Sequence, residues 1–314
     1  MNFTSGYLLF ILLFMLTVPV SATTLDREML DAALVGDDVA ISQLLSKGVS
    51  PDANSKFGKS AMMFAAEAGN IEVIQLLIKQ GADVNARSVA GCTALTYAAE
   101  NGYLDLVNFL IQKGSKTYPK TRAGWDALAM ATRQGHHEIL KTLISKGANV
   151  NTSDKDGTTA LMAAAERNDL LAVQILVEAD ADLHVRNKDG LSAMMLAACM
   201  GHTGIVDSLL KLKSNINAVD NDGSTALFCA AEDGHSSTLS LLLEHGSKID
   251  HKNVDGETAI FAATANGQTD TVRLLLKKGA DISVTNNNGK TVYDLAKKKR
   301  LKNILNLFDQ NKSR

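Results

Sequence analysis

Glycine recurs along this sequence at a fixed interval of 33 residues, and this interval constrains the fold more than any other feature. A fixed period of this length is typical of chains in which one small supersecondary unit is repeated and stacked on copies of itself. Three series of positions share the interval. The first is Gly58, Gly91, Gly124, Gly157, Gly190, Gly223, Gly256 and Gly289. The second is Gly48, Gly81, Gly114, Gly147, Asp180, Lys213, Gly246 and Gly279, and the third is Gly36, Gly69, Gly102, Gly135, Asn168, Gly201, Gly234 and Gly267.

These three series predict that each unit consists of a turn, a helix, a second turn and a second helix. A Ser, Thr or Asp stands two residues after every glycine of the first series, and these side chains cap helix N-termini. The helix that starts there contains alanine pairs such as Ala65-Ala66, which allow another helix to approach closely. The second helix has apolar residues at helical spacing and ends at a position suited to the left-handed conformation. Asp180 tolerates that conformation moderately, whereas we expect Lys213 to cost about 1 kcal/mol there relative to glycine.

A helix pair of this size cannot bury its own apolar face, so it must stack on at least about three copies of itself. We predict one repeat domain over residues 23–314. It comprises an N-terminal half-cap at 25–54, complete repeats over 55–285 and a C-terminal cap at 286–314. In the last unit the run Lys297 to Arg300 replaces the alanines, as expected for a polar outer face. Tyr118-Pro119 interrupts the pattern, and a local widening of the stack and simple sequence drift both explain it.

Residues 1–22 have the features of a signal peptide. The stretch from Tyr7 to Val20 is almost entirely apolar, and Val20 and Ala22 have the small-residue spacing that precedes a cleavage site. Cleavage would leave Thr23 as the mature terminus and a secreted or periplasmic protein. The alternative is an uncleaved membrane anchor, although a spanning helix needs about 20 apolar residues. The segment before Tyr7 contains no Lys or Arg, which is unusual for bacterial export.

The motif around the first glycine series resembles the ankyrin-repeat family. Its Gly-x-Thr-Ala-Leu form occurs at Gly157–Leu161 and Gly223–Leu227, and Gly256–Ile260 differs only by an isoleucine. Alanine stands where the family has proline, and Met, Thr, Ala or Phe stands where it has histidine, as in Thr159–Ala165, which is similar to bacterial and protist members. The resemblance implies an all-α fold: an ankyrin-repeat solenoid of helix-turn-helix units with hairpin-like tips, stacked at right angles with a concave face. It also implies that the chain is a scaffold that binds a protein.

Family members generally bind partners through their tips and the concave face of their first helices, so we searched those positions for unusual residues. Trp125 is the single tryptophan, and Trp and Arg often dominate binding energy at interfaces. The predicted partner-binding residues are Phe57, Arg122, Trp125, Arg133, Gln134, Arg167, Leu191 and Met200. Together they suggest an aromatic anchor with a basic rim that meets an acidic or mixed partner surface. The alternative is that Trp125 folds back over its own helix and the arginines are merely solvated.

Composition and motifs argue against other classes of function. The formal net charge of −2 and the pI of about 6.4 do not favour nucleic acid as a partner. His136, His202 and His235 flank the same turn glycine in three different repeats, so they do not converge on one metal ion, and Cys92, Cys199 and Cys229 lack the spacing of a zinc site or a disulfide framework. We therefore predict no metal, no cofactor, no catalytic residue and no enzyme activity, and we expect a monomer. A second hypothesis is a membrane-tethered structural or protective factor that supports an envelope enzyme.

Overall fold

The chain folds entirely into short helices and turns. The computed structural model describes residues 24–312, so the predicted signal peptide lies outside the described residues. This described part contains 18 helices and no strand, which confirms the predicted all-α fold. The helices divide into two compact units whose boundary lies between Pro119 and Lys120. The boundary therefore falls at the dipeptide Tyr118-Pro119, where the sequence pattern is interrupted.

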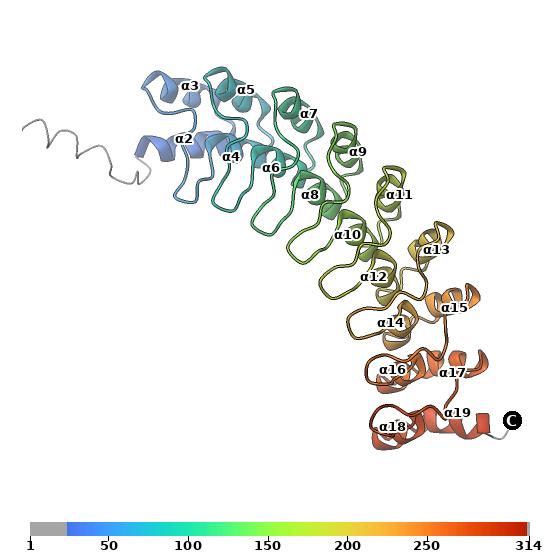
Figure 1. Ribbon diagram of the computed structural model, residues 1–314. Helices are drawn as coiled ribbons and strands as arrows, with labels where there is room; N and C mark the ends of the chain where they lie inside the picture. Colours follow the sequence, from blue (N-terminus) through green and yellow to red (C-terminus); the bar gives the residue numbers. More distant parts are fainter. Residues whose placement is uncertain (1–23, 313–314) are drawn as a thin grey trace, which may run out of the picture. The chain divides into compact units, whose positions relative to one another are not determined.

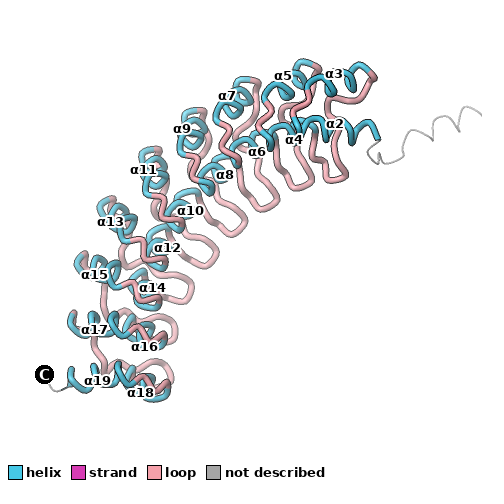
Figure 2. The backbone as a smooth tube through the Cα atoms, turned by 180° about the vertical axis from the view of Figure 1, so that it is seen from behind, coloured by secondary structure: helices cyan, strands magenta, loops and turns pink. Residues whose placement is uncertain are grey.

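The first unit contains three helix pairs (Figures 1 and 2). They are α2 (Thr24–Val35) with α3 (Asp38–Ser46), α4 (Ala61–Ala68) with α5 (Ile71–Lys79), and α6 (Ala94–Glu100) with α7 (Leu104–Gln112). The first helices pack on one another in the order α2, α4, α6, and α3 packs on α5 in a second layer. Each pair thus uses the next pair to cover its apolar face.

The second unit repeats this arrangement over six helix pairs. They are α8 (Ala127–Gln134) with α9 (His137–Ser145), α10 (Ala160–Glu166) with α11 (Leu170–Glu178), α12 (Ala193–Cys199) with α13 (Thr203–Lys211), α14 (Ala226–Glu232) with α15 (Ser236–Glu244), α16 (Ala259–Ala265) with α17 (Thr269–Lys277), and α18 (Val292–Lys298) with α19 (Lys302–Lys312). The first helices form one continuous layer and the second helices form another (Figure 1).

The predicted helix starts are confirmed at every repeat. The side chains of seven of the eight predicted caps accept a hydrogen bond from a backbone N–H in the first turn of the helix, as Asp126 does from Ala129 at 2.9 Å. Thr258 is the exception: it occupies the cap position of α16, but its hydroxyl is buried without a hydrogen-bond partner. The alanine pairs are also where the pattern predicts them, since Ala65, Ala66, Ala164 and Ala165 are fully buried. Their small side chains allow the first helices to pack closely.

The loop before each first helix forms a hairpin tip that is tied to the next tip. In the second unit the backbone N–H of Lys188 donates to the carbonyl of Asp156 at 2.8 Å, and the N–H of Val254 donates to Asp222 at 2.9 Å. Three basic side chains add a bond to a carbonyl 33 residues ahead: Lys120 to Ser153, Arg186 to Val219 and Lys252 to Thr285. The tips within this unit are thus held in register by both backbone and side chains.

The non-glycine residues of the second and third series adopt the left-handed conformation that their positions require. Asn168, Asp180 and Lys213 have φ angles of 59°, 61° and 63°. We expect Lys213→Gly to raise the free energy of unfolding by about 1 kcal/mol, because a residue with a Cβ is strained in this region. Gly246 occupies the same position one repeat later, with a φ of 87° and open space where a Cβ would lie. Gly246→Ala should therefore lower stability by about the same amount. Chemical denaturation of both variants checks this, and equal midpoints for both would contradict it.

Candidate partner-binding face

The tips and the exposed sides of the first helices lie on the same side of each unit, and we call this surface the front face. Tip residues and first-helix residues touch there, as Trp125 of a tip does with Arg133 of α8. In the second unit a hollow of about 640 Å³ on this face is lined both by tip residues such as Asn286 and Lys290 and by Leu295 and Lys298 of α18. The front face contains most of the predicted partner-binding residues.

Trp125 is placed by a tight tip that starts at Thr121. The Thr121 N–H donates to the Trp125 carbonyl at 2.8 Å, and the Trp125 N–H donates back to the Thr121 hydroxyl at 3.1 Å. Gly124 closes the turn by donating to the Thr121 carbonyl at 2.9 Å. Asp126 then caps α8. The local sequence therefore fixes the backbone position of Trp125 just before the start of α8.

The indole ring of Trp125 is held from two sides. Its Nε1–H donates to Asp154 Oδ2 at 3.1 Å, and the Arg133 guanidinium lies 4.3 Å from the ring centroid. Asp154 is itself fixed, because its Oδ1 accepts from the N–H groups of Asp156 and Thr158 at 2.9 and 2.8 Å. The ring therefore contacts both Arg133 of its own repeat and Asp154 of the next tip. The ring is nevertheless only half-buried, so part of it remains available to a partner.

The other predicted residues of the second unit are spread along its front face. Arg122 is exposed in the same tip as Trp125, and Gln134 is exposed at the end of α8. Arg167 and Met200 occupy the C-caps of α10 and α12, where both are exposed. Leu191 follows the tip glycine of the next repeat and is half-buried. Trp125 and Arg133 are thus in direct contact, Arg122 and Gln134 lie in the same repeat, and the others lie on the two following repeats.

Phe57 belongs to the first unit, whereas the other predicted residues belong to the second. It is 64% exposed at a tip, where the Lys56 ammonium lies 5.0 Å from its ring centroid. Turn formation does not require an exposed phenylalanine there. Val89 of the next tip is 49% exposed, and its N–H donates to the Phe57 carbonyl at 2.8 Å. The first unit therefore presents its own apolar tips.

A cation-aromatic cluster that the sequence pattern did not predict lies on the front face of the first unit. The Lys59 ammonium lies 4.3 Å from the Phe64 ring centroid, 4.5 Å from that of Tyr97 and 2.5 Å from Glu67 Oε2. Burial and the neighbouring Cys92 thiol raise the pKa of Tyr97 above its usual range. A comparison of equivalent positions would have found this cluster, because Lys59 occupies the position that Trp125 occupies two repeats later.

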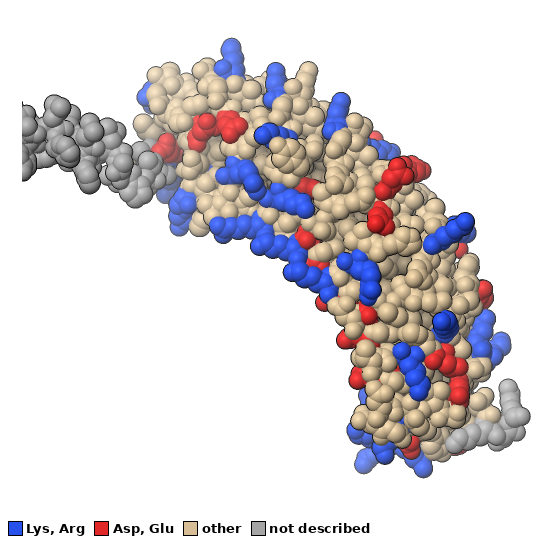
Figure 3. All heavy atoms as spheres, in the orientation of Figure 1, with Lys and Arg blue, Asp and Glu red and all other residues tan. Residues whose placement is uncertain are grey.

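The balance of charge differs between the tips of the second unit. Arg122 is exposed in the first tip, and the next two tips pair an exposed lysine with an exposed aspartate, Lys155 with Asp156 and Lys188 with Asp189. In two later tips the exposed acids are Asp222 and Asp255, the latter near the exposed Lys252. Figure 3 shows the basic side chains along the tip edge near α8 to α12 and acidic ones near α14 and α16. Burial raises the pKa of Glu232, at the end of α14, and the carboxylates of Asp233 and Asp220 raise it further. The basic part of this face coincides with Trp125.

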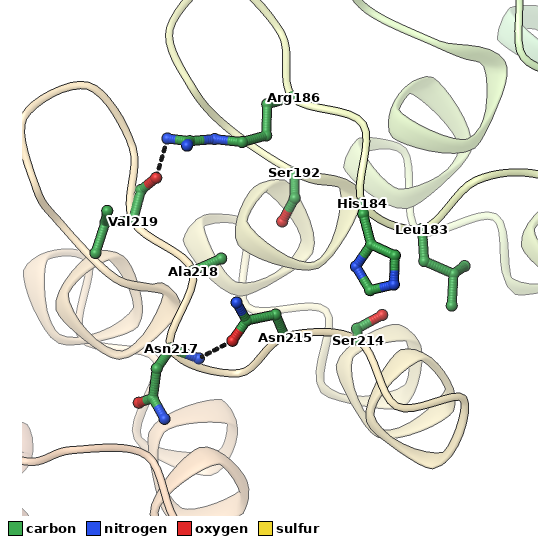
Figure 4. Close-up of a pocket in the computed structure, with 9 residues that line it drawn as sticks. All are labelled: Leu183, His184, Arg186, Ser192, Ser214, Asn215, Asn217, Ala218 and Val219. Atoms are coloured by element: carbon green, nitrogen blue, oxygen red, sulfur yellow. Dashed lines mark hydrogen bonds between the residues drawn. The ribbon is translucent and has the colours of Figure 1, made fainter.

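A separate cavity of about 290 Å³ lies where the turns of two consecutive repeats meet (Figure 4). Arg186 crosses it to donate to the carbonyls of Gly190 and Val219, and Asn215 Oδ1 accepts from the Asn217 N–H at 3.1 Å. The buried hydroxyl of Ser214 lines the cavity without a hydrogen-bond partner. Ser247, at the same position one repeat later, is unpaired in the same way. We therefore interpret this cavity as a structural feature of the interface between consecutive repeats, which recurs along the second unit.

Several histidines make contacts between neighbouring repeats. His137 Nε2 lies 2.8 Å from both carboxylate oxygens of Asp169, His202 Nε2 lies 2.9 Å from the Glu166 carbonyl, and His251 Nε2 lies 3.0 Å from the Gly223 carbonyl. Among residues 24–312 no group of three or more His, Cys, Asp or Glu side chains is arranged to hold a metal ion. No helix over the same range has the length and apolar character needed to cross a membrane.

The repeats can be compared with known protein families. A family model for ankyrin repeats in three copies matches residues 29–121, 114–187, 164–253 and 246–313. A search of curated proteins finds no match. The overlapping matches extend over most of the chain and cover the helix pairs of both units. The 33-residue period, the stacked helix pairs and the family match agree, and the chain belongs to the ankyrin-repeat family.

Proposed function

We propose that this chain is an exported scaffold that binds a protein partner through the front face of its ankyrin repeats and has no catalytic role of its own. Ankyrin repeats generally act as scaffolds for protein-protein interaction. The arrangement around Trp125 carries the proposal. A large aromatic ring is fixed at the front face by Arg133 and Asp154 but keeps an accessible part. A fixed aromatic residue loses little conformational entropy when a partner covers it, and this favours affinity.

The partner surface that fits this region is acidic with an apolar centre. Arg133 lies on the Trp125 ring, and Arg122, Lys155 and Arg167 are exposed on the same tips and helix ends. Carboxylates of a partner would pair with these cations while an apolar side chain contacts the ring. Exposed charge pairs of this kind mainly accelerate association and weaken with salt. We therefore propose that the complex forms fastest at low ionic strength.

A pull-down that compares three forms of the full chain tests this proposal. Trp125→Ala with Arg133→Ala should lose a partner that the wild type recovers, because such residues often contribute 2 kcal/mol or more to binding, or about 30-fold in affinity. The matched control is Lys211→Ala with Leu212→Ala, which removes an exposed cation at the end of α13, a second helix, and the 42% exposed apolar side chain of its C-cap residue. Equal recovery of every partner by all three forms, with unchanged helix content, would refute the proposed site.

The export part of the proposal rests on residues 1–22 and has its own test. Sequencing the N-terminus of the protein purified from its natural source should give Thr23 if the segment is a cleaved signal peptide. An intact Met1 would instead support the second hypothesis, a membrane-tethered factor that supports an envelope enzyme. The pull-down result does not depend on which terminus is found.

A further inference from the structure

Two of the three cysteines meet on the first helices of consecutive repeats in the second unit. Cys199 is the last residue of α12, and Cys229 lies within α14, which packs directly on α12 (Figure 1). The two thiols are within hydrogen-bonding reach of each other. Their positions differ by 30 residues, so they do not occupy equivalent positions in their repeats. Cys199 instead lies one helical turn beyond Leu196, the residue that corresponds to Cys229 in the preceding repeat.

The two thiols have different surroundings. Cys199 is half-buried, whereas Cys229 is only 9% exposed. The hydrogen bond with Cys199, burial and the carboxylates of Asp220 and Glu232 all raise the pKa of Cys229 far above its usual range. Cys199 is the more exposed of the two and is therefore the thiol that a dissolved reagent reaches first. Cys92, the third cysteine, lies in the other unit beside Tyr97.

We propose that Cys199 and Cys229 form a redox-active pair that closes to a disulfide by exchange with a small dissolved disulfide such as oxidised glutathione. In the first step the Cys199 thiolate attacks one sulfur of glutathione disulfide, and one glutathione leaves as a thiolate. In the second step the Cys229 sulfur attacks the Cys199 sulfur of the mixed disulfide, and the Cys229 proton passes to the glutathione sulfur. The second glutathione then leaves as a thiol. Two protein thiols are oxidised, and one glutathione disulfide is reduced to two thiols.

The new bond would join the first helices of two consecutive repeats. A disulfide requires the two Cβ atoms to approach to about 3.8 Å. Each repeat contacts only its neighbours, so this approach adjusts a single inter-repeat interface and leaves the remaining interfaces intact. The bond would lie next to Met200 on the front face. In an oxidising compartment such a pair would be closed, and in a reducing one it would be open. The proposal does not depend on the proposed partner.

The test is to equilibrate the folded full chain in glutathione redox buffers, quench with acid, alkylate the remaining thiols and measure the mass. The wild type should lose two hydrogens, bind no glutathione and keep one alkylated cysteine, Cys92. A peptide map should join Cys199 to Cys229. Cys92→Ser should form the same disulfide. Cys199→Ser and Cys229→Ala should give only glutathione adducts, and these should need about tenfold or more oxidised glutathione, because the second thiol is no longer held nearby.

Two results in the wild type would overturn the proposal. One is that all three cysteines remain available to alkylation in oxidised glutathione while circular dichroism shows native helix content. The other is that Cys199 carries glutathione at equilibrium and does not pass to an internal disulfide. Both results come from the unmodified sequence, so the conclusion does not rely on variants that fold poorly.

Discussion

Replacing Phe261 with alanine should lower the free energy of unfolding by about 3–5 kcal/mol, as truncation of a buried aromatic side chain typically does. Phe261 lies in α16 and is fully buried. Its helix packs between α14 and α18, so the lost ring weakens contacts to the repeats on both sides. It occupies the position where the family resemblance implies histidine. The loss of unfolding free energy thus measures how much the packing of the Phe261 ring stabilises a position where the family has a hydrogen-bonding histidine.

The matched control is Phe57→Ala, the same substitution at a residue that is 64% exposed. We expect a change within about 0.5 kcal/mol for this variant. Urea unfolding followed by circular dichroism measures both variants. Repeat arrays often unfold in more than one step, so the midpoint of the earliest transition is the quantity to compare. Similar midpoints for the two variants would show that Phe261 does not support the stack.

A second large effect is expected at Gly124, in the tip that carries Trp125. Its φ is 94°, and a Cβ placed there would lie 2.7 Å from the Lys155 nitrogen and 2.8 Å from Asp154 Cα. These are backbone atoms of the next tip, so no side-chain rotation relieves the clash. Gly124→Ala combines the left-handed strain with overpacking, and we expect a loss of about 2–4 kcal/mol. The same change should displace Asp154 from the Trp125 indole.

Gly246→Ala is again the appropriate control, because it has a similar φ of 87° and nothing near the added methyl group. It isolates the conformational strain, for which we expect about 1 kcal/mol. The difference between the two variants therefore reports the contact between neighbouring tips. Denaturation midpoints measure the loss of stability, and the tryptophan emission spectrum reports the displacement of Asp154 from the Trp125 indole. If Gly124→Ala were no more destabilising than Gly246→Ala, the close approach of the two tips would be wrong.

The sequence predicts the fold well because each element depends on chemistry that recurs every 33 residues. Helix caps such as Thr159 and left-handed positions such as Lys213 depend only on residues nearby in the sequence, so local sequence rules suffice to predict them. Thr258 shows the limit of these rules. It stands at a cap position like its equivalents, but its hydroxyl finds no partner once α16 is packed.

The candidate site was less predictable because it depends on contacts between repeats. The sequence indicates that Trp125 and Arg133 share a tip and helix, but not that Asp154, 29 residues later, would hold the indole. Lys59 was missed because a lysine at a tip is expected to be solvated, whereas its side chain is 15% exposed and lies against two aromatic rings. The sequence does not indicate that Cys199 and Cys229 are neighbours, because residues that differ in register come together only when the helices are stacked.

Fluorine NMR of the protein labelled with fluorotryptophan tests most directly whether the partner binds at the proposed face. The chain contains a single tryptophan, so the spectrum should show one resonance, from Trp125. Adding the partner recovered in the pull-down should shift or broaden this resonance, and salt should reverse the change as it weakens the complex. If the complex forms and the resonance stays unchanged, the partner binds elsewhere and the proposed role of the front face around Trp125 is wrong.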